Sequence, residues 1–319
     1  MATPTLISTR GAADHQVLIR PVIEALDRIV VGKARQITLS VACLLARGHL
    51  LIEDVPGVGK TTLAHALARA LGLSYHRIQF TSDLLPADVI GVSVFHRDNS
   101  RFEFHKGPVF SQLVLADEIN RATPKAQSAL LEAMEERQVT ADGTTYSLPV
   151  PFFVVATRNP ANQIGTFPLP ESQLDRFLMQ IELGYPAPSD ERILLANGER
   201  RALVEQQHAV VSLDVLLRLQ DQVAKVHVSE PLLDYVQALL AYTRESGEFV
   251  AGLSPRAGIG LLRAAQAWAL LNGHGGVHPE DIQSVLGSIV AHRLQLAHGS
   301  SIESGTNLGA AILAAVPVP

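Results

Sequence analysis

The residues best suited to chemistry include Lys60 and Thr61, which follow a short loop containing Gly57 and Gly59. An apolar run at 50–52 precedes the loop, and apolar residues at helical spacing follow it. A strand, a glycine loop and a helix in this order gather main-chain N–H groups around one point, which suits a phosphate. The lysine can neutralise β- and γ-phosphates, and the threonine hydroxyl can ligate Mg²⁺. We therefore predict a nucleotide-phosphate site formed by Pro56, Gly57, Val58, Gly59, Lys60, Thr61 and Thr62.

One position departs from the usual phosphate-binding loop. The pattern G-x-x-x-x-G-K-[ST] begins with glycine where this chain has Asp54. We expect Asp54 to be tolerated because Gly57 and Gly59 supply the close backbone approach, with the carboxylate facing away from the phosphates. The alternative, a turn that merely contains Gly-Lys-Thr, is disfavoured by the strand–loop–helix context.

A second apolar run, 113–116, ends in two adjacent carboxylates, Asp117 and Glu118. Successive strand side chains point to opposite faces, so the two groups can serve different roles. Asp117 can hold Mg²⁺, while Glu118 can polarise a water in line with the γ-phosphate. Carboxylates at the tip of a buried strand are costly without a metal or a partner, which favours this interpretation.

Further motifs follow the phosphate loop and the carboxylate pair along the chain. Residues 117–122, 156–160, 169–171 and 174–177 resemble the motifs of an AAA+ ATPase. They are most similar to the MoxR group, within the clade of the magnesium-chelatase ATPase subunit and the minichromosome-maintenance helicases. The resemblance covers roughly residues 28–290. It implies an α/β fold, with a five-stranded parallel sheet flanked by helices and then a smaller all-helical lid, and it implies ATP and Mg²⁺ as cofactors of ATP hydrolysis.

The resemblance also assigns roles beyond the phosphate loop. Asn159 follows a third apolar strand and matches sensor 1, where an amide contacts the attacking water or the γ-phosphate; an Asn-Pro turn is compatible with that role. Arg176 matches the arginine finger, which reaches the ATP of a neighbouring subunit; the alternative is a surface pair between Asp175 and Arg176. Arg158 stands where the family more often has glutamine, which suggests an extra interface charge.

Two more segments could contact the nucleotide. Ser254 suits a helix N-cap and Pro255 the first helical position, which places Arg256 in the first turn. A cation there opposes the helix dipole, so a phosphate could compensate, as at the family's sensor 2; an acidic side chain nearby is the alternative. Val31 and Gly32 resemble the adenine-contacting segment, or else form a simple turn between helices.

Composition limits the classes that fit. With 319 residues, two domains are the natural expectation, and a net charge of −5 argues against binding to nucleic-acid phosphates. The single cysteine, Cys43, excludes an intramolecular disulfide. The apolar stretches are too short for membrane insertion and no signal peptide is evident, so we expect a cytoplasmic protein. His274 and His278 lie in a glycine-rich turn without a metal-binding motif, so we predict no histidine metal site.

The chain divides into three parts. Residues 1–14 are predicted to be disordered, 15–185 to form the nucleotide-binding core and 186–319 to form the lid. Alternating strands and helices predict a parallel sheet with strands near 49–53, 75–80, 113–117, 152–156 and 177–182. Helices are expected near 16–29, 34–46, 189–201, 213–226, 230–243, 255–272 and 279–296.

Two hairpins interrupt the alternation. Residues 92–95 and 101–105 flank Asp98-Asn99-Ser100, and a second pair of short strands flanks Asp142-Gly143, a strong hairpin turn. Within the resembling clade these are the helix-2 and pre-sensor-1 insertions. A nucleic-acid motor needs cations on such hairpins, whereas 138–148 carries no Lys or Arg, so nucleic acid is an unlikely partner.

The remaining alternatives are a nucleotide-regulated switch and a metal-chelatase motor subunit. The chain lacks a suitably placed [NT]-K-x-D guanine motif, so ATP is preferred to GTP. A chelatase subunit would have almost the same ATPase module and stays the runner-up. We expect a homo-oligomeric ring, a hexamer, that remodels or matures a client protein. The resemblance implies a client with a von Willebrand factor A domain.

Overall fold

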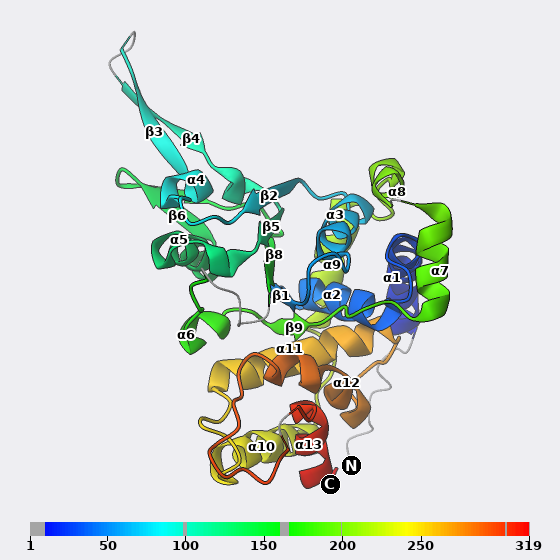
Figure 1. Ribbon diagram of the computed structural model, residues 1–319. Helices are drawn as coiled ribbons and strands as arrows, with labels where there is room; N and C mark the ends of the chain where they lie inside the picture. Colours follow the sequence, from blue (N-terminus) through cyan, green and yellow to red (C-terminus); the bar gives the residue numbers. More distant parts are fainter. Residues whose placement is uncertain (1–9, 98–100, 160–165, 199, 304, 319) are drawn as a thin grey trace, which may run out of the picture.

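The computed structural model describes residues 10–97, 101–159, 166–198, 200–303 and 305–318. Its centre is a five-stranded parallel sheet, as the alternating pattern predicted (Figure 1). The spatial order is β2-β5-β8-β1-β9, so β1 lies between β8 and β9. The strands are β1 (Leu50–Glu53), β2 (Tyr75–Gln79), β5 (Leu113–Asp117), β8 (Phe153–Arg158) and β9 (Met179–Ile181).

Alternate strand residues feed two separate apolar cores, as expected for a sheet covered on both faces. Leu50 and Ile52 of β1 join one core, whereas Leu51 joins the other. The first core contains helices α1 (Arg10–Ile29), α2 (Ala34–Leu45) and α3 (Lys60–Ala70). The second contains α4 (Pro86–Ile90) and α5 (Pro124–Glu136). The sheet is thereby held rigid beneath the loops at its ends.

Both predicted hairpins are present. The first pairs β3 (Gly91–His96) with β4 (Arg101–Lys106) and extends well beyond the sheet (Figure 1). Its predicted turn, 98–100, lies outside the described residues. The second pairs β6 (Gln138–Ala141) with β7 (Thr144–Ser147) around Asp142 and Gly143, which both have positive φ. That conformation matches the Asp-Gly turn predicted from the sequence.

No strand follows β9 in the described residues, where the chain is helical. The helices are α6 (Glu171–Leu174), before β9, and then α7 (Pro188–Asn197), α8 (Arg201–Gln206), α9 (Leu213–Val223), α10 (Glu230–Glu245), α11 (Pro255–Leu271), α12 (Pro279–Val290) and α13 (Leu308–Ala315). Figure 1 shows α10 to α13 gathered beyond one end of the sheet. Their apolar residues continue the core of α1–α3, and α9 joins the same core, where Gln220 donates to the Leu44 carbonyl of α2 at 2.8 Å.

Several element predictions need correction. Helix α1 begins at Arg10, so the disordered segment predicted for 1–14 was too long; residues 1–9 lie outside the described part. The helix expected at 189–201 ends earlier, because α7 stops before Gly198, whose φ of +66° suits glycine, and α8 was not predicted. Helix α12 ends at Val290 rather than near 296, and α13 was not predicted. Among the described helices, none has the length and apolar content needed to cross a bilayer.

Candidate active site

The predicted phosphate loop has an open, glycine-dependent backbone. Gly57 and Gly59 have φ values of +86° and +99°, which favour glycine, and an added Cβ at either would meet no atom within 4 Å. Gly59 caps α3, and no side chain among the described residues makes a capping bond at this helix start. Those donors are therefore available to an anion, as the sequence predicted. Thr61 and Thr62 lie half-buried in the first turn.

Lys60 lies at the centre of the loop with its side chain held by the surrounding backbone. Its Nζ donates to the carbonyls of Asp54 and Val55 at 2.6 and 2.9 Å, and to Oδ1 of Asn159 at 3.3 Å. Burial lowers the pKa of Lys60, while the nearby carboxylates, led by Asp54, oppose that shift. The lysine is thus placed to give its charge to an anion in the glycine loop.

Asp54 turns its carboxylate away from the loop, as we expected. One oxygen accepts from the Val55 N–H at 2.8 Å, and the other accepts from the N–H groups of Leu183 and Gly184, both at 2.6 Å. Leu183 and Gly184 follow β9 and lead toward α7. Asp54 therefore fastens the start of the phosphate loop to the segment through which the chain leaves the sheet.

Asp117 ends β5 and is nearly buried. Its Oδ1 accepts from the Thr157 hydroxyl at 2.5 Å, and its Oδ2 accepts from Nε and Nη2 of Arg77 at 3.0 and 2.7 Å. Each carboxylate oxygen keeps further acceptor capacity. Oxygen ligands of this kind, the Asp117 carboxylate and the hydroxyl of Thr61 in the first turn of α3, fit the ligand preference of Mg²⁺.

Glu118 differs from its neighbour because the strand stops before it. Its φ of +58° places it in the left-handed region, so this turn, and not strand alternation as we predicted, separates the two carboxylates. Its side chain accepts from Asn159 Nδ2 at 3.1 Å and Gln79 Nε2 at 3.0 Å, and it pairs with Arg121 at 3.1 Å. Asn159 therefore links Lys60 to Glu118, bringing the predicted sensor 1 residue to the candidate base.

Arg176 and Arg256 lie at the opposite end of the sheet from Lys60. Arg176 precedes β9, and Arg256 is in the first turn of α11. Both approach Oε2 of Glu135, Arg256 through Nη2 at 2.5 Å and Arg176 through Nε at 4.0 Å. Arg176, Arg256 and Glu135 line a cavity of about 480 Å³, together with Gly48, which lies just before β1. Its arginines are Arg47, Arg137, Arg176, Arg256, Arg263 and Arg293.

This geometry separates the predicted catalytic residues into two groups. Lys60, Asp117, Glu118 and Asn159 meet at the carboxyl end of the strands. The two arginines meet at the amino end, and β1 alone spans four residues, or roughly 13 Å at 3.3 Å per residue. The acidic partner considered for Arg256 exists, as Glu135. The Asp175–Arg176 surface pair does not form; Asp175 bonds to Arg293 at 2.7 Å instead.

Comparison with known proteins explains the arrangement. Residues 49–179 match the model of the ATPase family associated with various cellular activities (AAA), and residues 241–310 match the AAA lid domain. Chaperone MoxR1 of Mycobacterium tuberculosis is 41% identical over 90% of this chain and 78% of its own length. The chain belongs to the MoxR family of AAA+ ATPases.

Other relatives of this MoxR-family ATPase agree. The protein YeaC of Bacillus subtilis is 44% identical, with 96% of each chain covered. Protein MoxR of Paracoccus denitrificans is 35% identical over 89% of this chain and 91% of its own. A crystal structure from Cytophaga hutchinsonii has a TM-score of 0.86 at 39% identity, covering 97% of both chains.

Two arginines in the MoxR-family core have local partners. Arg121 pairs with Glu118, three residues earlier. Arg158, which we interpreted as an interface charge, pairs with Glu53 at 2.7 Å and donates to Gln180 at 3.2 Å. Its side chain is 20% exposed, and its role at an interface stays a prediction. The pair joins three neighbouring strands, β1, β8 and β9, beside the phosphate loop.

The adenine-contacting segment predicted at Val31 and Gly32 connects α1 to α2. Gly32 has a φ of +72°, and an added Cβ would collide with Asp190 of α7. The next residue, Lys33, donates to the Tyr185 carbonyl at 2.9 Å, close to the segment held by Asp54. This turn therefore contacts the start of the lid, while its contact with adenine stays a prediction.

Sequence reasoning discounted His274 and His278, yet the structure brings them together with Asp281. Ligand atoms of the three lie within 4.8 Å of one another. Nδ1 of His274 is 3.1 Å from both oxygens of Asp281, which also accepts from the His278 N–H at 2.9 Å. These bonds form the capped start of α12, and the absence of a histidine metal site stays a prediction.

Several site residues were missed because their signal is not local. Arg77 and Gln79 lie two residues apart on β2, and their side chains contact Asp117 and Glu118 at the end of the neighbouring strand β5. Polar residues two apart on a short strand could have indicated a shared face. The contacts of Glu135 and Arg293 join segments about 118 to 121 residues apart. A single sequence carries no periodicity that connects them.

Proposed function

We propose that this MoxR-family protein is a ring-forming, Mg²⁺-dependent ATPase that hydrolyses ATP between subunits and uses the motion to remodel or mature a client protein. The separation of the two groups of catalytic residues carries this proposal. A nucleotide in the glycine loop would meet Lys60 and Glu118 of its own chain, while Arg176 and Arg256 lie beyond the other end of the sheet. Placing one subunit's arginine pair against the next subunit's loop completes each site.

The chain's own residues then divide the chemistry. The glycine loop and the α3 N-terminus bind the phosphates, and Lys60 neutralises their charge. Thr61 and Asp117 would hold Mg²⁺, which when bound would neutralise negative charge on the phosphates. Glu118, oriented by Asn159, accepts a proton from the attacking water. The neighbour's Arg176 stabilises the developing charge, a contribution worth about 10³–10⁵ in rate for such fingers.

A mixing experiment tests the shared site. Glu118→Gln and Arg176→Ala should each be nearly inactive alone, Arg176→Ala retaining ATP binding and losing on the order of 10³ in rate. Differently tagged copies can be co-expressed and purified through both tags, so that mixed assemblies form. Some interfaces then pair an intact Glu118 with an intact Arg176, and partial ATPase activity should return. No recovery, or a monomer indifferent to Arg176→Ala, would refute the ring mechanism.

The client and setting are part of the same proposal. The name of the relative Chaperone MoxR1 supports a chaperone-like role, and the resemblance to MoxR proteins supports a hexamer acting in the cytoplasm on a protein with a von Willebrand factor A domain. A Glu118→Gln trap should retain such a client in the presence of Mg-ATP. Sedimentation with and without ATP would give the subunit number. Capture of no such client would leave only the ATPase.

A further inference from the structure

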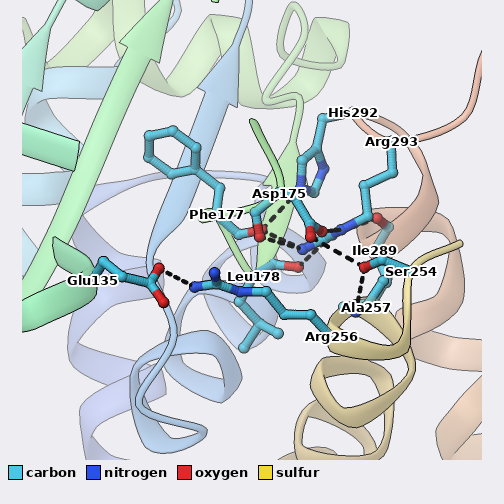
Figure 2. Close-up of polar contacts among 10 residues, drawn as sticks. All are labelled: Glu135, Asp175, Phe177, Leu178, Ser254, Arg256, Ala257, Ile289, His292 and Arg293. Atoms are coloured by element: carbon cyan, nitrogen blue, oxygen red, sulfur yellow. Dashed lines mark hydrogen bonds and ion pairs between the residues drawn. The ribbon is translucent and has the colours of Figure 1, made fainter. Parts of the chain in front are cut away.

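Arg293 lies just after α12, and most hydrogen bonds of its guanidinium go to one short segment, 175–178. Its side chain is 7% exposed, and an arginine has five N–H donors. All five find acceptors, and most of these lie in 175–178, on either side of Arg176 (Figure 2). The acceptors are Asp175 Oδ1 at 2.7 Å and the carbonyls of Asp175, Phe177, Leu178 and Ile289 at 3.3, 2.6, 3.1 and 2.7 Å.

Asp175 connects this segment to the helix start that carries Arg256. Its second carboxylate oxygen accepts from the Ser254 hydroxyl at 3.1 Å. Ser254 Oγ in turn accepts from the Ala257 N–H at 3.0 Å, which makes it the N-cap of α11. Arg256 lies between these two residues. One carboxylate therefore joins the backbone of Arg176 to the helix start that carries Arg256.

The side-chain tips of the arginine pair also converge. Glu135 of α5 receives Arg256 directly and lies 4.0 Å from Arg176, and the hydrogen bond from Arg256 lowers the pKa of Glu135. Its negative charge offsets the repulsion between the two cations. His292 also contacts the segment before β9, because its Nε2 lies 2.9 Å from the Phe177 carbonyl. Burial lowers the pKa of this ring, so it stays neutral.

We propose that Arg293 is a positioning residue for ATP hydrolysis. Through Asp175 and Ser254, it fixes Arg176 of the core and Arg256 of the lid as one unit that would face the neighbouring subunit's nucleotide. This inference rests on the proposed shared site. Lysine cannot replace Arg293, because a single ammonium lacks the planar fork that reaches acceptors on several sides. A misplacement of about 1 Å at a catalytic group can cost roughly 10² in rate, so the effect should be large.

Arg293→Lys and Asp175→Asn test the role with little change in volume. Each should lower kcat by about tenfold to 10²-fold, with the nucleotide affinity of its own loop unchanged. Arg218→Lys is the matched control, because Arg218 is exposed on α9 and bonds only the Asp214 carbonyl of its own helix. The control should keep full turnover. Wild-type kcat in both test variants would overturn the proposal.

Co-assembly separates positioning from general damage. Arg293→Lys should regain activity with Glu118→Gln, because their lesions lie on opposite sides of an interface, and should fail with Arg176→Ala, whose lesion lies on the same side. The reverse pattern would overturn the proposal, and so would failure of both test variants with both partners, since that would show a role in folding alone. Recovery between Glu118→Gln and Arg176→Ala is the reference; if that pair fails, the proposed shared site itself is wrong.

Discussion

Removing the Asp54 carboxylate should weaken the fold much more than it weakens nucleotide binding. The side chain is 8% exposed and accepts three main-chain N–H groups, including those of Leu183 and Gly184. A buried donor left without a partner costs roughly 1–3 kcal/mol, so two such groups predict a loss of about 3 kcal/mol in the free energy of unfolding for Asp54→Ala. Asp54→Gly should lose about 0.5–1 kcal/mol more, because glycine frees the unfolded backbone.

ATP affinity should respond differently because the carboxylate faces away from the loop. Loosening the loop weakens binding, while losing a negative charge near Lys60 strengthens it, so the two effects oppose. We expect a change below tenfold, about 1.4 kcal/mol, in Asp54→Ala and Asp54→Gly. Calorimetric titration of Mg-ATP in a Glu118→Gln background measures affinity without turnover.

Urea titration followed by circular dichroism measures the stability of the same variants. Asp88→Ala is a suitable control, because that exposed carboxylate accepts one N–H, from Leu85, and its loss should cost only about 1 kcal/mol. Wild-type stability in Asp54→Ala would refute the stabilising role of the hydrogen bonds between Asp54 and the segment after β9. An affinity gain far above tenfold in Asp54→Gly would instead show that the native loop is a compromised ATP site.

Three further changes test the site and the core. Glu118→Gln should bind Mg-ATP normally and lose about 10²–10⁴ in turnover, the scale of a positioned base, and full turnover would end that assignment. Lys60→Ala should bind ATP more weakly in the same titration, because no other described side chain places a positive charge within the loop. Unchanged affinity would contradict this. Burial lowers the pKa of His49 from 6.5 to about 4, so the unfolded chain takes up a proton first and stability falls as pH drops through this window. This one residue predicts a loss of about 2 kcal/mol between pH 7.5 and pH 5, checked by urea titrations at both values, and equal stability at both would refute it.

Local patterns were enough to predict the sheet and the loop at its end. The run before Gly57 is buried on both faces of the sheet, so it reads as a continuous apolar segment, and the loop then needs glycines with positive φ. Glu118 follows its strand directly and Lys60 follows the short loop after its own strand, so the sequence alone placed them at one edge. The Asp142-Gly143 turn was predictable for the same reason, because its chemistry lies within a few residues.

Long-range polar contacts were not predictable from one sequence. Arg256 shows the limit: its helix start was read correctly from Ser254, but its partner, Glu135, lies 121 residues away on α5. The pairing of Arg158 with Glu53 was not predicted, because Glu53 lies on an adjacent strand and that adjacency depends on strand order. Neither contact leaves a periodic signal, since each joins elements that only the folded topology brings together.

The strand order also supports the proposed site shared between two chains. Parallel strands put every loop that follows a strand at one end of the sheet and every segment that precedes a strand at the other. The residues proposed to bind and hydrolyse ATP follow β1, β5 and β8, whereas Arg176 precedes β9. Arg176 belongs to the core, because the next residue, Phe177, is buried in the second apolar core, while Arg256 begins a lid helix. Arg293 and Asp175 join these two parts, so in the proposed ring the arginine pair would face the neighbouring subunit as one unit.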